Sequence, residues 1–272
     1  MLNEESGHST FNIEHSQSQK SAAAVNMYES KNYQYFEDVN WGLLRLWDDR
    51  KNLDVLDVGC GFATTSQHIE KRGNRVTGIE SSAEAVAVAR TRVSEVIHAD
   101  LQNHPLGGRR FDVIIFADVL EHLPWPVGVL RGYLDLLKDG GRVIVSLPNV
   151  GLWSVRLNLL LGRFQYEETG VLDRTHLRFF TRRTAREMIE STGLEIVRRT
   201  YNPGLVRPFV PLAKKLLGGG RTSDSHDPSS LLESRPYKLY LKTIYPIERI
   251  VASAWPGALA FQMIFEGQKK VD

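Results

Sequence analysis

The stretch Val55-Leu56-Asp57-Val58-Gly59-Cys60-Gly61-Phe62-Ala63 (VLDVGCGFA) decides the fold of this chain. An apolar run carries one carboxylate and then meets two glycines that flank a single residue. The run predicts a buried strand, and the glycines allow a sharp turn whose backbone can approach a ligand closely. A helical pattern follows at once, and the start of a helix offers unpaired N–H groups. The stretch therefore predicts a strand, a tight turn and a helix at a ligand-binding edge.

Outward from this stretch, strand-like apolar runs alternate with helical patterns. The predicted strands are Leu53–Val58, Asn74–Glu80, Val93–Ala99, Phe111–Ala117, Arg142–Leu147 and Leu194–Thr200. The predicted helices are Ala63–Arg72, Ala83–Arg92, Val127–Lys138, which ends at Asp139-Gly140-Gly141, and Thr184–Thr192. This alternation is typical of parallel strands with right-handed crossovers and helices on both faces. The fold class is therefore α/β, a three-layer Rossmann-like sheet.

Composition excludes several classes of protein. The chain has 272 residues, 24% charged and 42% hydrophobic, with a net charge of +2, so bulk charge predicts no nucleic-acid partner. Cys60 is the single cysteine, which excludes an intrachain disulfide and fits a reducing compartment. The first twenty residues lack the apolar core of a signal peptide, and no apolar run of about 18 residues predicts a spanning helix. We therefore expect a cytoplasmic protein.

The spacing of acids and glycines points to a nucleoside ligand. In open parallel sheets, ligands lie beyond the carboxyl ends of the strands. Asp57 and the glycines mark one such end, and Glu80 ends the next predicted strand, nineteen residues after Gly61. An acid at that place can accept hydrogen bonds from ribose hydroxyls.

Two cofactors compete for this pattern. A nicotinamide dinucleotide favours a small residue at position 64, where the chain has Thr64, and its pyrophosphate would be repelled by Asp57. S-adenosylmethionine carries an amine, a sulfonium and a ribose but no phosphate, so the same carboxylate attracts it. The sequence therefore favours S-adenosylmethionine, with an NAD-dependent dehydrogenase as the alternative enzyme. A non-catalytic scaffold that binds S-adenosylmethionine is the alternative from another class.

Five separated motifs resemble the class I S-adenosylmethionine-dependent methyltransferases. They are LDVGCG (56–61), GIESS (78–82), HADL (98–101), FDVIIFADVLEHLPWP (111–126) and LLKDGGRVIVSLPN (136–149). The chain is most similar to a bacterial group that acts on small molecules, is associated with glycan synthesis and is related to the ubiquinone-biosynthesis type; LDRTHLRFFT (172–181) also resembles that group. The resemblance implies a seven-stranded sheet, mostly parallel, with a reversed last strand, for which Ala260–Glu266 is the candidate.

The resemblance also implies a set of cofactor-binding residues. The methionyl part is expected at Asp57, Gly59 and Gly61, and the ribose at Glu80, within the GIESS motif that also contributes Ser81. Asp100 and Leu101 are expected to frame the adenine. Ala117 and Asp118 are expected to line the floor near the reactive methyl group.

The domain organisation departs from a plain methyltransferase in one place. We expect a disordered tail at residues 1–25, a Rossmann-like core at 26–201, an insertion at 202–258, and the final strand with the C-terminus at 259–272. The insertion joins basic and apolar residues, with six cations and no acid between Ile196 and Ser223. It predicts either a helical cap over the substrate cleft or a peripheral membrane contact through residues 205–220. The oligomeric state is left open.

Two histidines are candidate catalytic residues. Methyl transfer from a sulfonium needs alignment, and a hydroxyl acceptor also gains from a base. His122 follows the fourth predicted strand, and it serves either as that base or as a brace for its loop. His176 serves either as a base or as a residue that orients its loop through Asp173. We therefore expect methylation of a small molecule or glycan, at oxygen before nitrogen or carbon.

A metal ion is a third interpretation of the same region. Asp118, Glu121 and His122 place three ligand types within five residues, and some relatives with Glu-x-x-Glu-His there bind a divalent ion. Because this chain has Asp118 in place of the first glutamate, we expect no metal ion.

Overall fold

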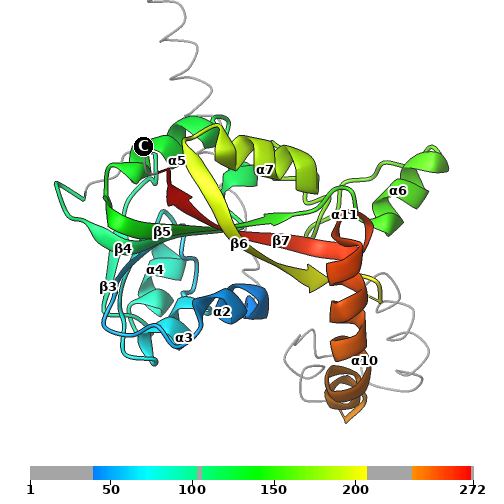
Figure 1. The fold of residues 1–272 in the computed structure, drawn as a ribbon, viewed down its shortest axis with the longest axis horizontal. Coiled ribbons are helices and arrows are strands. Elements are labelled where there is room, and N and C mark those ends of the chain that lie inside the picture. Colours follow the sequence, from blue (N-terminus) through cyan, green and yellow to red (C-terminus); the bar gives the residue numbers. More distant parts are fainter. Residues whose placement is uncertain (1–38, 103–105, 207–234, 271–272) are drawn as a thin grey trace, which may run out of the picture. The chain divides into compact units, whose positions relative to one another are not determined.

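The computed structural model describes residues 39–102, 106–206 and 235–270 (Figure 1). They form one seven-stranded sheet in the order β3-β2-β1-β4-β5-β7-β6. The strands are β1 (Asp54–Val58), β2 (Arg75–Glu80), β3 (Glu95–His98), β4 (Phe111–Ala117), β5 (Leu137–Pro148), β6 (Leu194–Pro203) and β7 (Ala260–Lys269). Each of the six strands predicted up to Thr200 has its counterpart in this sheet.

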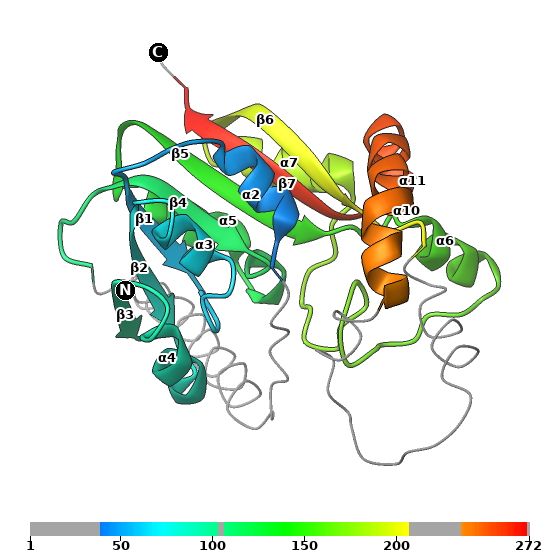
Figure 2. The same ribbon diagram turned by 90° about the horizontal axis from the view of Figure 1, so that it is seen from below.

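Helices lie on both faces of the sheet, as the alternation predicted (Figures 1 and 2). One face is covered by α5 (Pro126–Leu134) and α7 (Arg182–Glu190), and the other by α2 (Trp41–Trp47), α3 (Ser66–Glu70) and α4 (Ala83–Ala89). A short helix η1 (Leu120–His122) follows β4, and α6 (Trp153–Leu160) follows β5. The chain reaches β7 through α10 (Arg235–Ala254) and α11 (Pro256–Leu259).

The core consists of two apolar layers, because successive side chains of a strand point to opposite faces. Leu56 and Val58 of β1 belong to the layer under α5 and α7, whereas Val55 belongs to the layer under α2 to α4. The central strand β4 divides in the same way, with Ile114 on one face and Ile115 on the other. Full burial of each such side chain contributes about 1.5–3 kcal/mol relative to exposure. Continuous apolar runs are therefore the signature of this doubly covered sheet.

The last strand is reversed, which confirms the expected fold. β7 lies antiparallel between β5 and β6, with Val145 opposite Phe265 and Thr200 opposite Ile264. The other neighbouring strands pair in parallel. Because β7 runs backwards, its first residues lie at the carboxyl end of β5, where Pro148 is opposite Gln262.

One predicted boundary is wrong. The helical pattern was expected to continue to Lys138, but α5 ends at Leu134 and β5 begins at Leu137. Leu137 is buried opposite Phe111, and the pairing then shifts so that Arg142 lies opposite Val113. The glycines at 140 and 141 lie within this irregular strand, where Gly140 has φ of +72°, and do not end a helix. Burial of Leu137 in the sheet overrides the local helical pattern.

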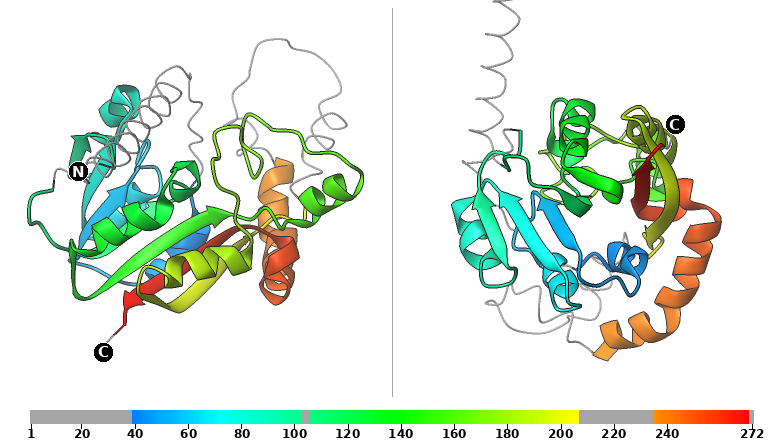
Figure 3. Two further views of the ribbon diagram at one scale, coloured as in Figure 1. Left: turned by 90° about the horizontal axis from the view of Figure 1, so that it is seen from above. Right: turned by 60° about the vertical axis from the view of Figure 1, so that its left-hand side comes forward.

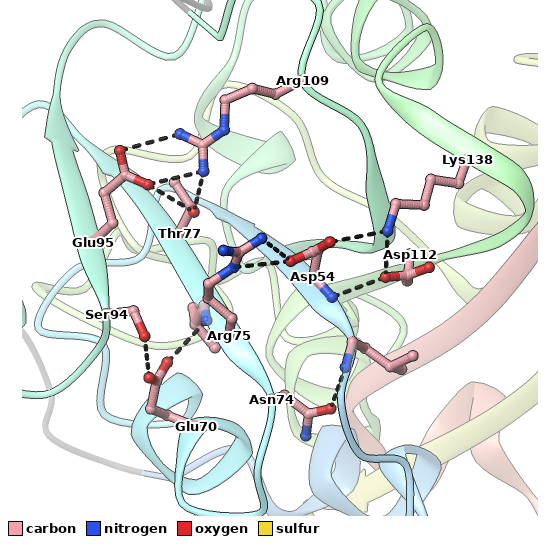
Figure 4. A network of polar contacts seen from close by, with 12 residues as sticks. Asp54, Glu70, Asn74, Arg75, Thr77, Ser94, Glu95, Arg109, Asp112 and Lys138 are labelled. Atoms are coloured by element: carbon pink, nitrogen blue, oxygen red, sulfur yellow. Dashed lines mark hydrogen bonds and ion pairs between the residues drawn. The ribbon is translucent and has the colours of Figure 1, made fainter.

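Ion pairs connect the strands at their amino ends, opposite the predicted site (Figure 4). Asp54 of β1 contacts Arg75 and Lys138, and Lys138 also contacts Asp112 at 2.8 Å. The hydrogen bond from Lys138 holds the pKa of Asp54 below its ordinary value. Because these groups are partly exposed, each pair contributes little stability. This end of the sheet is therefore a solvated charge network.

Several expectations fall on residues that the structure does not describe. The predicted tail at residues 1–25 and most of the predicted membrane contact at residues 205–220 lie outside the described residues. Within the insertion, the described helix α10 agrees with the helical pattern after residue 236. None of the helices in the described ranges is long and apolar enough to cross a membrane.

Candidate functional site

The glycine turn after β1 requires glycine for reasons of conformation and space. Gly59 has φ of +70° and Gly61 has φ of +51°, which L side chains rarely adopt. A Cβ on Gly59 would also lie only 2.4 Å from a methyl carbon of Val119. The amides of Gly59 and Cys60 donate to the carbonyl of Ile79 at 2.9 and 3.0 Å, so the turn folds over the end of β2.

Glu80 organises the backbone around this turn. Its carboxylate accepts hydrogen bonds from the Gly61 amide at 2.9 Å and from the Ser81 and Ser82 amides at 2.8 Å each. The side chain is buried. Three N–H donors hold the carboxylate in one orientation. The predicted ribose acid is therefore a fixed acceptor that joins the glycine turn to the loop before α4.

Asp57 is a buried carboxylate with one unsatisfied oxygen. Its Oδ2 accepts from the Ser66 hydroxyl, whereas Oδ1 has no hydrogen-bond partner among the described residues. Burial raises its pKa to about 6, and the charge of Glu80 adds to this effect. An orphaned carboxylate oxygen beside a second acid is a place where a cationic group would be stabilised. The residues present therefore fit the cationic, phosphate-free cofactor that the sequence favours.

The predicted adenine residues lie just beyond β3. Asp100 accepts from the Gln102 amide at 2.8 Å, and the Tyr133 hydroxyl donates to the Leu101 carbonyl at 2.6 Å. The His98 ring nitrogen contacts the Ser81 carbonyl at 2.9 Å. The ends of β2 and β3 are thereby tied together, so Ser81, Asp100 and Leu101 belong to the same edge as Glu80.

Asp118, at the end of β4 after Ala117, is held in an unusual conformation. It has φ of +56°, uncommon for a residue with a side chain. Its two carboxylate oxygens accept from the Ser146 hydroxyl at 3.1 Å and from the Gln262 amide. These two donors come from β5 and β7, so three strands that are far apart in the sequence converge on one carboxylate.

The hydrogen bonds behind Asp118 run in one direction. Arg45 donates to Asn202 at 3.1 Å, and Asn202 donates to both Asn40 and Gln262. Asn40 then donates to Ser146 at 3.1 Å, so both branches end on Asp118. A guanidinium can only donate and an ionised carboxylate can only accept, so the two ends fix the direction of every bond between them. We call these six residues the relay.

A second cluster joins η1 to the loop after α6. Glu121 is almost fully buried, and its Oε1 lies 3.9 Å from Nε2 of His176. The His122 and His176 rings meet edge to face, with centroids 4.8 Å apart. The Glu121 carbonyl accepts from the Leu177 and Arg178 amides, which anchors the loop against η1. Residues more than fifty positions apart in the sequence thus form one cluster.

The chemistry of this cluster follows from its partners. His122 Nδ1 lies 3.3 Å from the Thr175 carbonyl, and His176 Nδ1 lies 3.2 Å from the Val171 carbonyl. A carbonyl can only accept, so Nδ1 carries a hydrogen in both rings, and the neutral tautomer that this selects has its lone pair on Nε2. Burial, together with the charge of Asp118, raises the pKa of Glu121 well above its ordinary value, so the environment favours the neutral carboxyl.

This cluster also has the composition of a metal site. One ligand atom each from Glu121, His122 and His176 lies within 4.8 Å of the others. The metal interpretation from sequence used Asp118 in place of His176. Asp118 is outside this group, because Ser146 and Gln262 hold its carboxylate.

Sequence reasoning missed five of the six members of the relay: Asn40, Arg45, Ser146, Asn202 and Gln262. Ser146 lies in the LLKDGGRVIVSLPN motif but was not a candidate there, and the others lie outside the five motifs. The available signal was a polar residue within an apolar strand, as in RVIVSLP and AFQMIFE. Cys60 packs over Gly78, where an added Cβ would lie 2.6 Å from its sulfur. Trp125 is largely exposed, and Trp153 packs at the base of α6.

Comparisons with known proteins agree with this geometry. A family model described as "Methyltransferase domain" matches residues 32–199. The chain is 29% identical over 213 residues to the ubiquinone biosynthesis O-methyltransferase of Pseudomonas aeruginosa (strain UCBPP-PA14), covering 71% of this chain and 89% of the relative. It is 34% identical over 105 residues to the enzyme of that name from Serratia proteamaculans (strain 568), covering 35% and 42%.

Solved structures show the same fold at low sequence identity. A SAM-dependent methyltransferase from Archaeoglobus fulgidus superposes with a TM-score of 0.53 at 16% identity, covering 84% of this chain and 91% of that one. The cyclase SpnF superposes with a TM-score of 0.53 at 20% identity, covering 85% and 81%. Because a cyclase shares the fold, the fold alone does not identify the reaction.

Proposed function

The chain belongs to the methyltransferase domain family and is an S-adenosylmethionine-dependent methyltransferase, and from that premise we propose that it methylates an oxygen atom. The acceptor is a small molecule, a sugar or a glycan- or lipid-linked intermediate. The curated relatives named O-methyltransferases support the choice of oxygen. The paired histidines at the carboxyl edge support it as well, because a hydroxyl acceptor must lose a proton.

The donor pocket of this proposal is the edge formed by the ends of β1, β2 and β3. S-adenosylmethionine, when bound, supplies a methyl group that is already activated by the sulfonium. Asp57 holds the cationic methionyl part, and Glu80 accepts from the ribose hydroxyls. Gly59 and Gly61 keep the backbone close to the ligand, and Ser81 lies beside Glu80. Asp100 and Leu101 frame the adenine, and Ala117 and Asp118 line the floor under the methyl group.

The acceptor side of this proposal is the cluster of Glu121, His122 and His176. His122 is only partly buried, and its Nδ1–H is directed to a carbonyl, so Nε2 is the atom that takes the acceptor's proton. His176 is more deeply buried, and it orients His122 through the edge-to-face contact. The relay holds Asp118 in place while the acceptor oxygen approaches the methyl group in line.

The observation that carries the donor assignment is the unsatisfied oxygen of Asp57 beside the glycine turn. The test is calorimetry with S-adenosylhomocysteine, S-adenosylmethionine and NAD⁺ in parallel. We expect the two adenosyl compounds to bind and NAD⁺ to show no heat of binding. Binding of NAD⁺ alone would overturn the assignment in favour of a dehydrogenase. Donor binding without transfer to any acceptor in a cell extract would support the scaffold alternative.

The oxygen assignment needs a chemical readout. We would incubate the protein with S-adenosylmethionine carrying a ¹³C methyl group and a panel of phenols, catechols and sugar derivatives. The carbon chemical shift of the transferred methyl distinguishes a methoxy product from an N-methyl or C-methyl product. An N-methyl product would contradict the proposal and leave the donor pocket intact. The cytoplasmic location and the membrane contact through residues 205–220 stay predictions.

A further inference from the structure

Exposed apolar side chains gather in two segments of this molecule. Among the described residues, fifteen large apolar side chains are exposed, and twelve of them lie either between residues 157 and 166 or between residues 239 and 255. The other three are Trp41, Trp125 and Val197. Scattered exposed apolar residues are ordinary, but such a concentration marks an interaction surface. We call the two segments together the apolar rim.

The longer segment is one face of α10. Leu239, Ile244, Ile247, Ile250 and Val251 are all exposed, and Ile250 is 67% exposed. At 3.6 residues per turn they cover roughly 140° of the helix circumference. The buried stripe lies on another side, where Glu248 and Ala252 contact the body of the protein. α10 therefore packs through a narrow stripe and presents a wide apolar face outward.

The shorter segment is the end of α6 and the loop that follows. Residues 156–168 are all exposed, and Leu160 reaches 84% exposure. Leu159, Leu160 and Leu161 are consecutive, so they point to different sides of the helix end. A flat protein partner would cover one side of such a helix end and leave the rest in water. A lipid surface can surround all sides of an apolar end that enters it.

The charged side chains beside the exposed apolar residues of α6 and α10 are cations, and the exposed acids Glu167 and Glu168 follow only after Tyr166. On α10, Lys242 and Arg249 are exposed on the side that belongs neither to the apolar face nor to the buried stripe. On α6, Arg156 and Arg163 are exposed before and after the leucines. Residues 153–166 contain no acid. Glu248, the only acid of α10, is turned inward, where it accepts from Tyr240 and from the Val206 amide. Apolar faces flanked by cations are typical of helices that lie on anionic lipid.

The two segments lie at the same end of the molecule (Figure 3). α6 begins five residues after β5, and α11 leads directly into β7. Arg156 donates to the Gly257 carbonyl at 3.1 Å, which connects the start of α6 to α11. The apolar rim therefore borders the carboxyl edge of the sheet and is opposite the charge network of Figure 4.

From these observations we propose that the apolar rim of α6 and α10 docks the protein peripherally on an anionic lipid bilayer. The apolar side chains enter the boundary between headgroups and acyl chains, and the four cations lie at headgroup depth. This proposal is independent of which acceptor is methylated, and it assigns membrane contact to described helices and not to residues 205–220.

The test is co-sedimentation of the full chain with vesicles. We expect binding to vesicles of equal parts phosphatidylcholine and phosphatidylglycerol, weaker binding at high salt, and little binding to pure phosphatidylcholine. Leu160→Glu and the double variant Ile247→Glu/Ile250→Glu should each bind the anionic vesicles at least roughly tenfold more weakly, because each places an acid in the rim. Val197→Glu is the matched control, because it adds the same charge at an exposed apolar position of β6, and it should bind as the wild type does.

Two further measurements keep the outcomes distinct. Calorimetry with S-adenosylhomocysteine should give unchanged affinity in every variant, which shows that the folded core is intact. Light scattering measures the molar mass in solution and so detects a dimer in which a second copy of the chain covers the apolar rim. Wild-type protein that ignores anionic vesicles, rim variants that bind as well as Val197→Glu, or a dimer that Ile247→Glu/Ile250→Glu dissociates would overturn the proposal.

Discussion

The donor half and the acceptor half of the candidate site are built in different ways. The donor half is local, because Asp57, the glycine turn and Glu80 come from two adjacent strands and the turns that follow them. Its acids are placed by backbone N–H groups and by Ser66. The acceptor half joins η1 to a loop about fifty residues later, and burial raises the pKa of its acid, Glu121, well above the ordinary value.

This difference shows how one edge of a sheet can hold a group that binds a cation and, separately, a group that accepts a proton. Binding a cation needs carboxylates that can be ionised, and the donor half keeps the pKa of Asp57 near 6. Moving a proton needs neutral groups with a lone pair, and the acceptor half has two imidazoles in fixed tautomers. Changes in one half should therefore leave the function of the other intact, and four variants examine that separation.

The largest effect is expected for His122→Ala. Loss of a general base lowers turnover by about 10² to 10⁴-fold. The affinity for S-adenosylhomocysteine should be unchanged, because His122 belongs to the acceptor half. The readout is kcat with the acceptor that isotope labelling identifies, together with calorimetry of the donor. His68→Ala, a histidine on α3 outside the cluster, is the control and should retain full turnover; equal rates in the two variants would reject the base assignment.

A smaller effect is expected for Glu80→Ala. The variant loses the acceptor of three backbone amides and of the ribose hydroxyls, which we estimate at about 2–3 kcal/mol, or roughly 10²-fold in donor affinity. Calorimetry with S-adenosylhomocysteine measures it. Glu84→Ala removes an exposed acid of the neighbouring helix and should leave the affinity unaltered. If Glu80→Ala bound the donor normally, the assignment of the ribose acid would be wrong.

Asp57→Asn should stabilise the protein while weakening donor binding. A carboxyl whose pKa rises from 3.8 to about 6 on folding lowers folding stability as pH increases between these values. Above pH 6 this lowers the free energy of unfolding of the wild type by about 3 kcal/mol, and the asparagine variant, which cannot ionise, regains that stability. Denaturant unfolding at pH 5 and pH 7.5 measures the gain, which should be larger at pH 7.5.

Asp54→Asn is the control for this experiment, because it should lower folding stability where Asp57→Asn raises it. The pKa of Asp54 is lowered, so its charge contributes stability above pH 4 that the variant loses. Asp57→Asn should also weaken binding of both S-adenosylmethionine and S-adenosylhomocysteine, because both ligands carry the α-ammonium of the methionyl part. Unchanged affinity for both ligands would show that Asp57 does not bind the cationic part.

The smallest effect is expected for Glu121→Gln. Because burial raises the pKa of Glu121 and so favours its neutral form, the uncharged amide is a close substitute, and the unfolding free energy at pH 7 should change by less than about 1 kcal/mol. Chemical denaturation measures it. A loss of several kcal/mol, or a stability that depends on a chelator, would show an ionised Glu121 that binds a cation together with His122 and His176.

The two halves also differed in how far sequence alone could predict them. The glycine turn and Glu80 were predictable because their spacing is local and the strands are continuous apolar runs. The reversed strand came from the family resemblance, since antiparallel insertion leaves no local mark. The contact of His122 with His176 and the relay depend on which strands are neighbours, and Gln262 lies 144 positions from Asp118. Burial in β5 likewise overrode the helical pattern near Lys138.

The position of β7 bears on the order in which the site is completed during synthesis. β5 and β6 have no contact as neighbours in the sheet until residues 260–269 lie between them. Gln262, one of the two donors that hold Asp118, arrives with that strand. A ribosome that has released residues 1–250 therefore carries a nascent chain with the glycine turn and both histidines but without a finished sheet. The enzyme becomes competent only when its last strand has been translated and inserted.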